Sequence, residues 1–181
     1  MKRLVRPTLA ATALLALLVG CSALAPRSSG ERAGTLGLSD GAHSVDELVQ
    51  DFVLAIRKND PNTLRRLRVS EQEYRQVILP GSVQPSEPPK EFTAEFEEYL
   101  WGSLDGKNRH GERDLLTRWG GKTLSVEKAS FSRGVRPYRG YTAYSRLDLT
   151  LRDDHGAEVR FEMGSVAQVA DRYKFISFMR D

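Results

Sequence analysis

The order of apolar and polar residues divides the chain into a helical first part and a stranded second part. The clearest helix follows Ser44, because Ser44 and Glu47 have the spacing of a capping box. Apolar residues then recur every three or four positions, with charged and polar residues between them. This pattern predicts a buried helix face made of Val45, Leu48, Val49, Phe52, Val53 and Ile56.

Two shorter helices and a longer one are expected next. Asp60-Pro61 supplies an N-cap and a first-turn proline, and the segment from Ser70 to Glu73 is a second capping box. The helical pattern then continues to Pro80, and a proline-rich loop covers residues 81–89. A third amphipathic helix is expected over residues 92–104, and its buried side would consist of Phe92, Phe96, Tyr99 and Leu100.

Residues 105–111 (DGKNRHG) are rich in turn formers, and we expect a turn there. A separate, shorter helix is expected over residues 114–119, ending at Gly120-Gly121.

From Lys122 onward the apolar residues alternate with polar ones, which is typical of strands with one buried face. A change of phase between Val126 and Ala129 predicts a β-bulge, and Asp153 to Gly156 predicts a hairpin turn. The inward face is expected to consist of Tyr141, Ala143, Ser145, Leu147, Leu149, Leu151, Val159, Phe161 and Met163. Helices followed by an antiparallel meander indicate an α+β domain, with N-terminal helices packed on a curved antiparallel sheet.

The first twenty residues have the parts of a secretory signal peptide. Lys2, Arg3 and Arg6 form a basic start, and an uncharged run rich in Ala and Leu extends from Leu9 to Val19. This run is too short for a bilayer core, which needs about 20 residues. We therefore expect residues 1–20 to be a removable signal rather than a membrane-spanning helix.

The residues Leu18-Val19-Gly20-Cys21 resemble the lipobox of bacterial lipoproteins. The resemblance implies cleavage before Cys21, diacylglycerol on its thiol, an acyl chain such as palmitate on the new amine, and attachment to a membrane of the cell envelope. Ser22 in the next position implies the outer membrane, on its periplasmic side, where the source has one. The alternative is an ordinary signal peptide, but Cys21 is the sole cysteine and stands where cleavage would leave it first.

The expected domain limits follow from this reading. Residues 21–43 are rich in Gly, Ser and Ala and are expected to form a flexible tether. Residues 44–181 are expected to form a single α+β domain.

Removing the signal also changes the charge balance. The full chain has 27 Lys and Arg against 24 Asp and Glu, and residues 1–20 hold three of these cations and no acid. The rest of the chain therefore carries 24 charges of each sign. We expect no nucleic-acid partner, because the basic excess belongs to the signal.

The early helix (DFVLAIRKNDPNTLRRL) and the ending (ADRYKFISFMRD), in this order of elements, resemble the cone-shaped fold of nuclear-transport-factor-like and ketosteroid-isomerase-like proteins. One departure is the lack of a short hairpin between the second and third helices, where residues 77–79 would form at most a strand fragment. A cystatin-like or another helix-on-sheet domain is the alternative. This fold hosts enzymes, binding modules and dimerisation platforms, so it does not define a function.

The predicted inward face has no carboxylate or histidine to serve as a general base. His43, His110 and His155 all fall in expected loops or turns, and their spacing matches no metal site. We therefore name no catalytic residue, metal ligand or cofactor. A small isomerase- or hydrolase-like enzyme that uses the cone pocket remains the alternative function.

The segment 133–146 (RGVRPYRGYTAYSR) interleaves arginines with tyrosines, a composition typical of surfaces that recognise sugars, anionic polymers or proteins. The alternative is an exposed loop and edge strand whose basic residues block unwanted pairing. We expect a membrane-anchored lipoprotein with a non-enzymatic binding or assembly domain that has an envelope protein or polymer as partner. The candidate binding residues are Arg133, Arg136, Tyr138, Arg139, Tyr141 and Tyr144.

Overall fold

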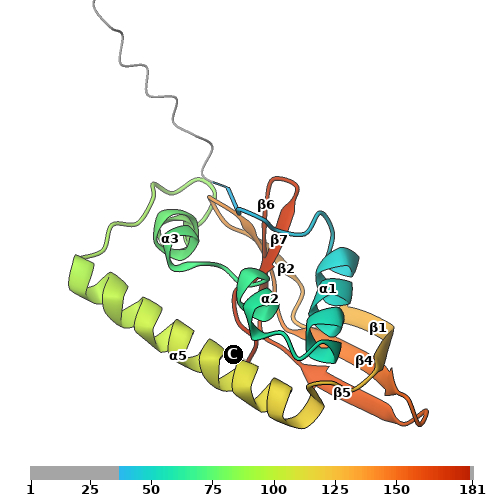
Figure 1. Cartoon of the computed structure of the whole chain (residues 1–181). Coiled ribbons are helices and arrows are strands. Elements are labelled where there is room, and N and C mark those ends of the chain that lie inside the picture. Colours follow the sequence, from blue (N-terminus) through green and yellow to red (C-terminus); the bar gives the residue numbers. More distant parts are fainter. Residues whose placement is uncertain (1–36, 180–181) are drawn as a thin grey trace, which may run out of the picture. The chain divides into compact units, whose positions relative to one another are not determined.

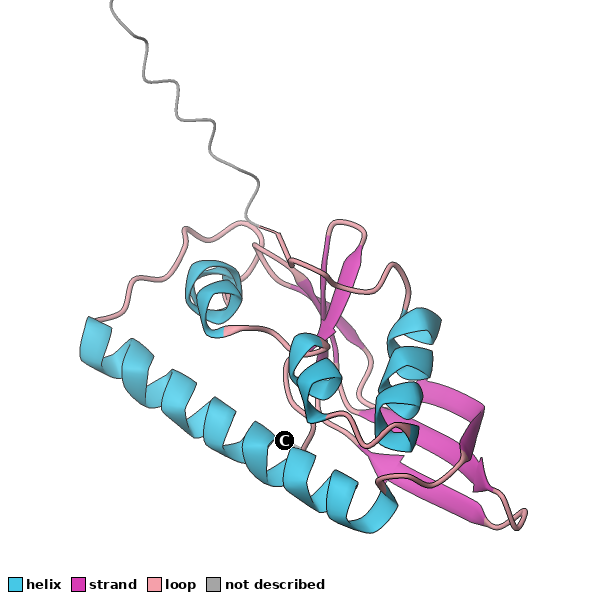
Figure 2. Cartoon of the chain, viewed as in Figure 1, coloured by secondary structure: helices cyan, strands magenta, loops and turns pink. Residues whose placement is uncertain are grey.

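The computed structural model describes residues 37–179 and shows helices together with two antiparallel sheets (Figures 1 and 2). The predicted α+β class is therefore confirmed. The signal peptide, Cys21 and most of the predicted tether fall on residues 1–36, outside the described part. Within the described part, no helix has the length and apolar character needed to cross a membrane.

Helix α1 (Val45–Arg57) begins as the sequence predicts. The Ser44 hydroxyl accepts a hydrogen bond from the Glu47 amide at 3.0 Å. The Glu47 carboxylate, however, accepts from the backbone of His43 at 2.6 Å and so reaches one residue beyond the predicted capping box. The predicted apolar face is buried, apart from the half-buried Val45.

Four short helical segments follow the first helix. Helix α2 (Pro61–Arg66) is capped by Asp60, and α3 (Glu71–Glu73) has the complete capping box on Ser70. The chain continues without a break into a π-helical turn, η1 (Tyr74–Ile78), and then α4 (Leu79–Gly81). Residues 77–79 are therefore helical, and the strand fragment considered there is wrong.

Helix α5 (Ala94–Trp119) is a single helix of 26 residues, so the turn expected at 105–111 and the separate short helix are wrong. His110 consequently lies in a helix rather than a turn. The prediction failed because the face that α5 buries is polar at this point. Its buried residues are Asp105, Asn108, Gly111 and Glu112. Conversely, Phe96 and Tyr99, expected to be buried, are 47% and 69% exposed.

The strands form two antiparallel sheets. The three-stranded sheet has the order β1-β4-β5, with β1 Leu124–Phe131, β4 Leu147–Asp153 and β5 Glu158–Glu162. The four-stranded sheet has the order β2-β3-β6-β7, with β2 Val135–Pro137, β3 Thr142–Tyr144, β6 Val166–Val169 and β7 Arg172–Phe175.

The strand irregularities follow the sequence in part. The predicted bulge is confirmed, because the β1–β4 register shifts between Val126 and Lys128. The predicted turn at 153–156 joins β4 to β5, with Gly156 at a φ of 80°. The alternating residues 141–152 do not form one strand, because they are divided between the two sheets at Arg146, which has a φ of 56°.

Helix α1 packs against the main apolar cluster, in which the three-stranded sheet takes part. Phe52 of α1 is fully buried, and its ring lies edge-on to Phe161 of β5 at a centroid distance of 6.3 Å. Phe175 and Phe178 pack against the same ring at 5.4 and 5.9 Å. The predicted inward face is buried except at Ser145, which is half-buried.

Candidate functional site

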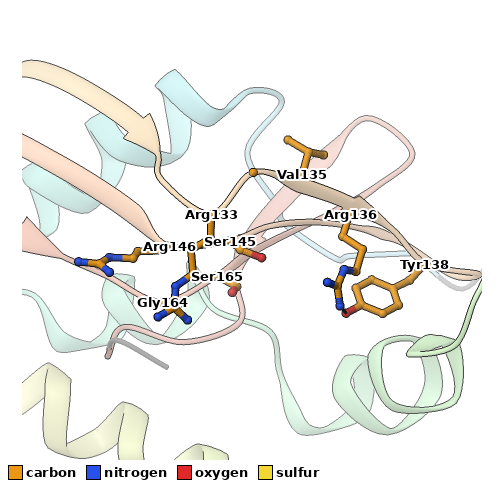
Figure 3. A pocket seen from close by; sticks show the side chains of 9 residues that line it. Arg133, Val135, Arg136, Tyr138, Ser145, Arg146, Gly164 and Ser165 are labelled. Atoms are coloured by element: carbon orange, nitrogen blue, oxygen red, sulfur yellow. Dashed lines mark hydrogen bonds between the residues drawn. The ribbon is translucent and has the colours of Figure 1, made fainter.

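An open, polar cavity of about 460 Å³ lies where the two sheets meet (Figure 3). Its walls come from the start of β2, the β3–β4 junction and the β5–β6 junction. We call it the arginine cavity, after the three guanidinium groups among its lining residues. These residues are Arg133, Gly134, Val135, Arg136, Tyr138, Ser145, Arg146, Gly164 and Ser165.

Backbone hydrogen bonds bring two of these walls together. The Arg133 amide donates to the Ser145 carbonyl at 3.2 Å, and the Ser145 amide donates to the Gly134 carbonyl at 2.9 Å. Gly134 has a φ of 80°, a conformation that glycine adopts without the steric cost of a side chain. Arg146 also lies in the left-handed region, and this bend coincides with the division of the strand between the sheets.

The three arginines differ in their partners. Arg146 is half-buried; its Nη2 lies 3.0 Å from Oε2 of Glu162 and its Nε lies 3.5 Å from Oδ1 of Asp148. Arg133 and Arg136 are exposed, and neither forms an ion pair with a carboxylate of residues 37–179. Arg136 instead approaches the hydroxyl of Tyr138 at 3.5 Å. The cavity therefore holds positive charge that the described part of the chain does not neutralise.

Three of the six candidate binding residues, namely Arg133, Arg136 and Tyr138, lie together in this cavity. Arg139 does not line it, because its Nη1 donates to the Glu87 carbonyl at 2.7 Å. Arg139 lines a separate hollow of about 230 Å³ beside Pro80 and Pro89.

The two remaining tyrosines do not line the cavity. Tyr141 is buried and its ring stacks on Tyr138 at 5.0 Å, with an interplanar angle of 18°. Burial, followed by the neighbouring Tyr138 and Tyr74, raises the pKa of Tyr141 well above its usual value. The Tyr144 hydroxyl donates to Oε1 of Gln168 at 2.6 Å, and its ring packs on Phe131. Tyr141 therefore contacts the lining residue Tyr138, whereas Gln168 and Phe131, which Tyr144 contacts, lie outside the cavity.

The candidate binding residues did not include the six other lining residues, Gly134, Val135, Ser145, Arg146, Gly164 and Ser165. The alternation with the predicted inward residues Ser145 and Leu147 puts Arg146 on the opposite sheet face, together with Asp148. Its distance to Asp148 agrees with that placement, but the bend at Arg146 also brings it to the cavity. No local signal identifies Gly164 or Ser165, because they come from the neighbouring β5–β6 junction.

The histidines lie apart from the cavity. His43 approaches Asp171 at 3.4 Å and Arg172 at 2.7 Å, whereas His155 is in the β4–β5 hairpin. Across residues 37–179, no group of three or more His, Cys, Asp or Glu side chains could hold a metal ion.

Comparison of the chain with protein-family models, with curated proteins and with solved structures finds no match.

Proposed function

We propose that this protein is a lipid-anchored lipoprotein of the cell envelope whose α+β domain binds an anionic partner in the arginine cavity. The partner is an envelope polymer or protein that presents carboxylate or phosphate groups. Cys21 carries the lipid, and the residues after it form a tether between the membrane and the domain. The proposed location is the periplasmic side of the outer membrane, where the source has one.

One observation carries the binding role: Arg133, Arg136 and Arg146 line one cavity, and the first two have no carboxylate partner in residues 37–179. Guanidinium groups form strong, bidentate hydrogen bonds with carboxylates and phosphates. Positive groups gathered in a hollow also concentrate anions at that point. Tyr138, and the hydroxyl groups of Ser145 and Ser165, add polar contacts around such a group.

A binding role is favoured over catalysis by the interior of the domain. The inner sheet face is filled by apolar contacts with α1, and Leu147, Leu149 and Leu151 are at most 1% exposed. An enzyme of the alternative kind needs an acid or base that faces an accessible pocket there. We also propose that the two sheets and α1 form the cone of the nuclear-transport-factor-like fold, supported by the α-then-β order and the antiparallel pairing.

The test is co-sedimentation with purified cell-wall polymer, performed with the Arg133→Ala/Arg136→Ala variant. Loss of two charge-assisted contacts, each worth about 1.5–3 kcal/mol, is expected to weaken binding at least tenfold. Arg139→Ala is the matched control, because Arg139 is a neighbouring exposed arginine outside the cavity. Equal binding of the polymer by the wild type, the double variant and Arg139→Ala would contradict the proposed site.

A further inference from the structure

Three stacked aromatic side chains lie at the start of α5: the half-buried Phe92, which precedes the helix, and the exposed Phe96 and Tyr99 in its first turns. The ring centroids of Phe92 and Phe96 are 5.7 Å apart, and those of Phe96 and Tyr99 are 6.3 Å apart, both pairs stacked. We call Phe92, Phe96 and Tyr99 the aromatic strip. No residue of α5 before Asp105 is buried, so Phe96 and Tyr99 lie on a part of the helix that is only lightly packed.

The strip has an acidic border. Glu91 and Glu95 are exposed beside it and form no ion pair with residues 37–179, whereas Glu98 pairs with Arg75. The chain also shows how a cation binds here, since Nζ of Lys90 lies 5.1 Å above the Phe92 ring. Aromatic faces and carboxylates together favour a partner that presents cationic groups.

The same chain also has a surface of the opposite charge, the arginine cavity. In the described part, the exposed large apolar side chains are Phe96, Tyr99 and Val135. The first two belong to the acidic strip, and Val135, at 56% exposure, lines the arginine cavity between Arg133 and Arg136. Exposed apolar groups within a charged surface are typical of interaction sites. Here the two surfaces differ in sign and each has an apolar centre.

We propose that the aromatic strip of one copy docks in the arginine cavity of a second copy. This inference rests on the proposed function and names its partner. Glu91 and Glu95 would face Arg133 and Arg136, while Tyr99 would enter the cavity against Val135 and Tyr138.

Two different surfaces meet in this contact, so it is heterologous and can extend from copy to copy. Its limited apolar content places it among small, weak interfaces. Anchoring in one membrane would strengthen it by raising the effective concentration of the copies.

The experiment is sedimentation velocity of the purified full chain over a concentration series. The wild type is expected to associate, whereas Glu91→Arg/Glu95→Arg and Arg133→Glu/Arg136→Glu are each expected to associate at least tenfold more weakly. An equimolar mixture of the two variants is expected to form pairs, because each supplies the surface that the other lacks. Phe96→Ala/Tyr99→Ala, which keeps every charge, is also expected to lose association. Asp46→Arg/Asp154→Arg, which reverses exposed acids elsewhere, is the control.

A wild type that stays monomeric, or association that neither charge reversal weakens, would overturn the inference. Binding of cell-wall polymer by the same variants separates the two proposals. If Arg133→Glu/Arg136→Glu loses the polymer while the wild type stays monomeric, the proposed function stands and the second copy is excluded as the partner. If that variant retains both polymer binding and association, both proposals fail.

Discussion

The side chain of Asn108, in the middle of α5, forms a hydrogen bond with the backbone of Phe178 in the C-terminal segment. Its side-chain oxygen accepts from the Phe178 amide at 2.8 Å, and its side-chain nitrogen donates to the Ile176 carbonyl at 3.0 Å. Asn108 is completely buried, so water does not substitute for either partner. The middle of α5 therefore packs against the C-terminal segment through a polar side chain and not through an apolar stripe.

Replacing Asn108 by alanine is therefore expected to destabilise the domain. The change leaves the buried Phe178 amide and the carbonyl of the half-buried Ile176 without their partner, and an unsatisfied buried group costs about 1–3 kcal/mol. Urea unfolding followed by circular dichroism should show a clearly lower midpoint. Ser103→Ala, at an exposed position of the same helix, should leave the midpoint almost unchanged. An unchanged midpoint for Asn108→Ala would mean that this contact does not hold the segment.

Gly106 offers a direct test of whether residues 105–111 are helical. It lies on the exposed side of α5, and an added Cβ would meet no atom within 4 Å. Alanine in a helix interior is more favourable than glycine by about 1 kcal/mol, so Gly106→Ala should stabilise the domain. Thermal unfolding measures the gain. A loss of stability would indicate a turn at this position.

Acid is expected to unfold the domain through two buried carboxylates. Burial alone would raise the pKa of Glu73, but hydrogen bonds from Ser70, Lys174 and Ser39 bring it below its usual value. Burial would likewise raise the pKa of Asp105, but hydrogen bonds from Arg109 and Arg68 outweigh this effect and bring the pKa below its usual value.

A carboxyl group whose pKa is lower in the folded state stabilises above its unfolded pKa and loses this contribution as pH falls through the folded value. The urea midpoint should therefore be flat near neutral pH and decline below about pH 4, the range of unperturbed carboxyl groups. Glu73→Gln should be less stable at pH 7, because Lys174 Nζ loses its charged partner at 3.0 Å. The variant should also be less sensitive to acid, because glutamine has no carboxyl group to protonate. An unaltered pH profile in this variant would exclude Glu73 as a contributor.

Cys21 tests the proposed anchor. Intact mass measurement of the protein from membranes should show a chain that begins at Cys21 and carries acyl groups. Cys21→Ala should lose this mass and leave the membrane fraction, because the variant lacks the acyl chains that are proposed to hold the protein in the membrane. A soluble chain without lipid would contradict the anchor and leave the binding site to be judged by itself.

The sequence by itself determined the features whose cause lies within a few residues. The caps at Ser44, Asp60 and Ser70, the apolar face of α1 and the bulge after Val126 all follow from local spacing. Such features depend on hydrogen bonds and periodicities that span at most four positions. The Arg and Tyr content of residues 133–146 was visible in the same way.

Only the tertiary structure decided the continuity of α5 and the composition of the cavity. Asp105 pairs with Arg68 at 2.7 Å and Glu112 with Arg65 at 2.9 Å, so polar residues that predict a turn are buried in a helix. Arg146 and Ser165 reach the cavity because a bent strand and its neighbour meet there. Burial of a polar group depends on partners tens of residues away, and local spacing carries no information about them.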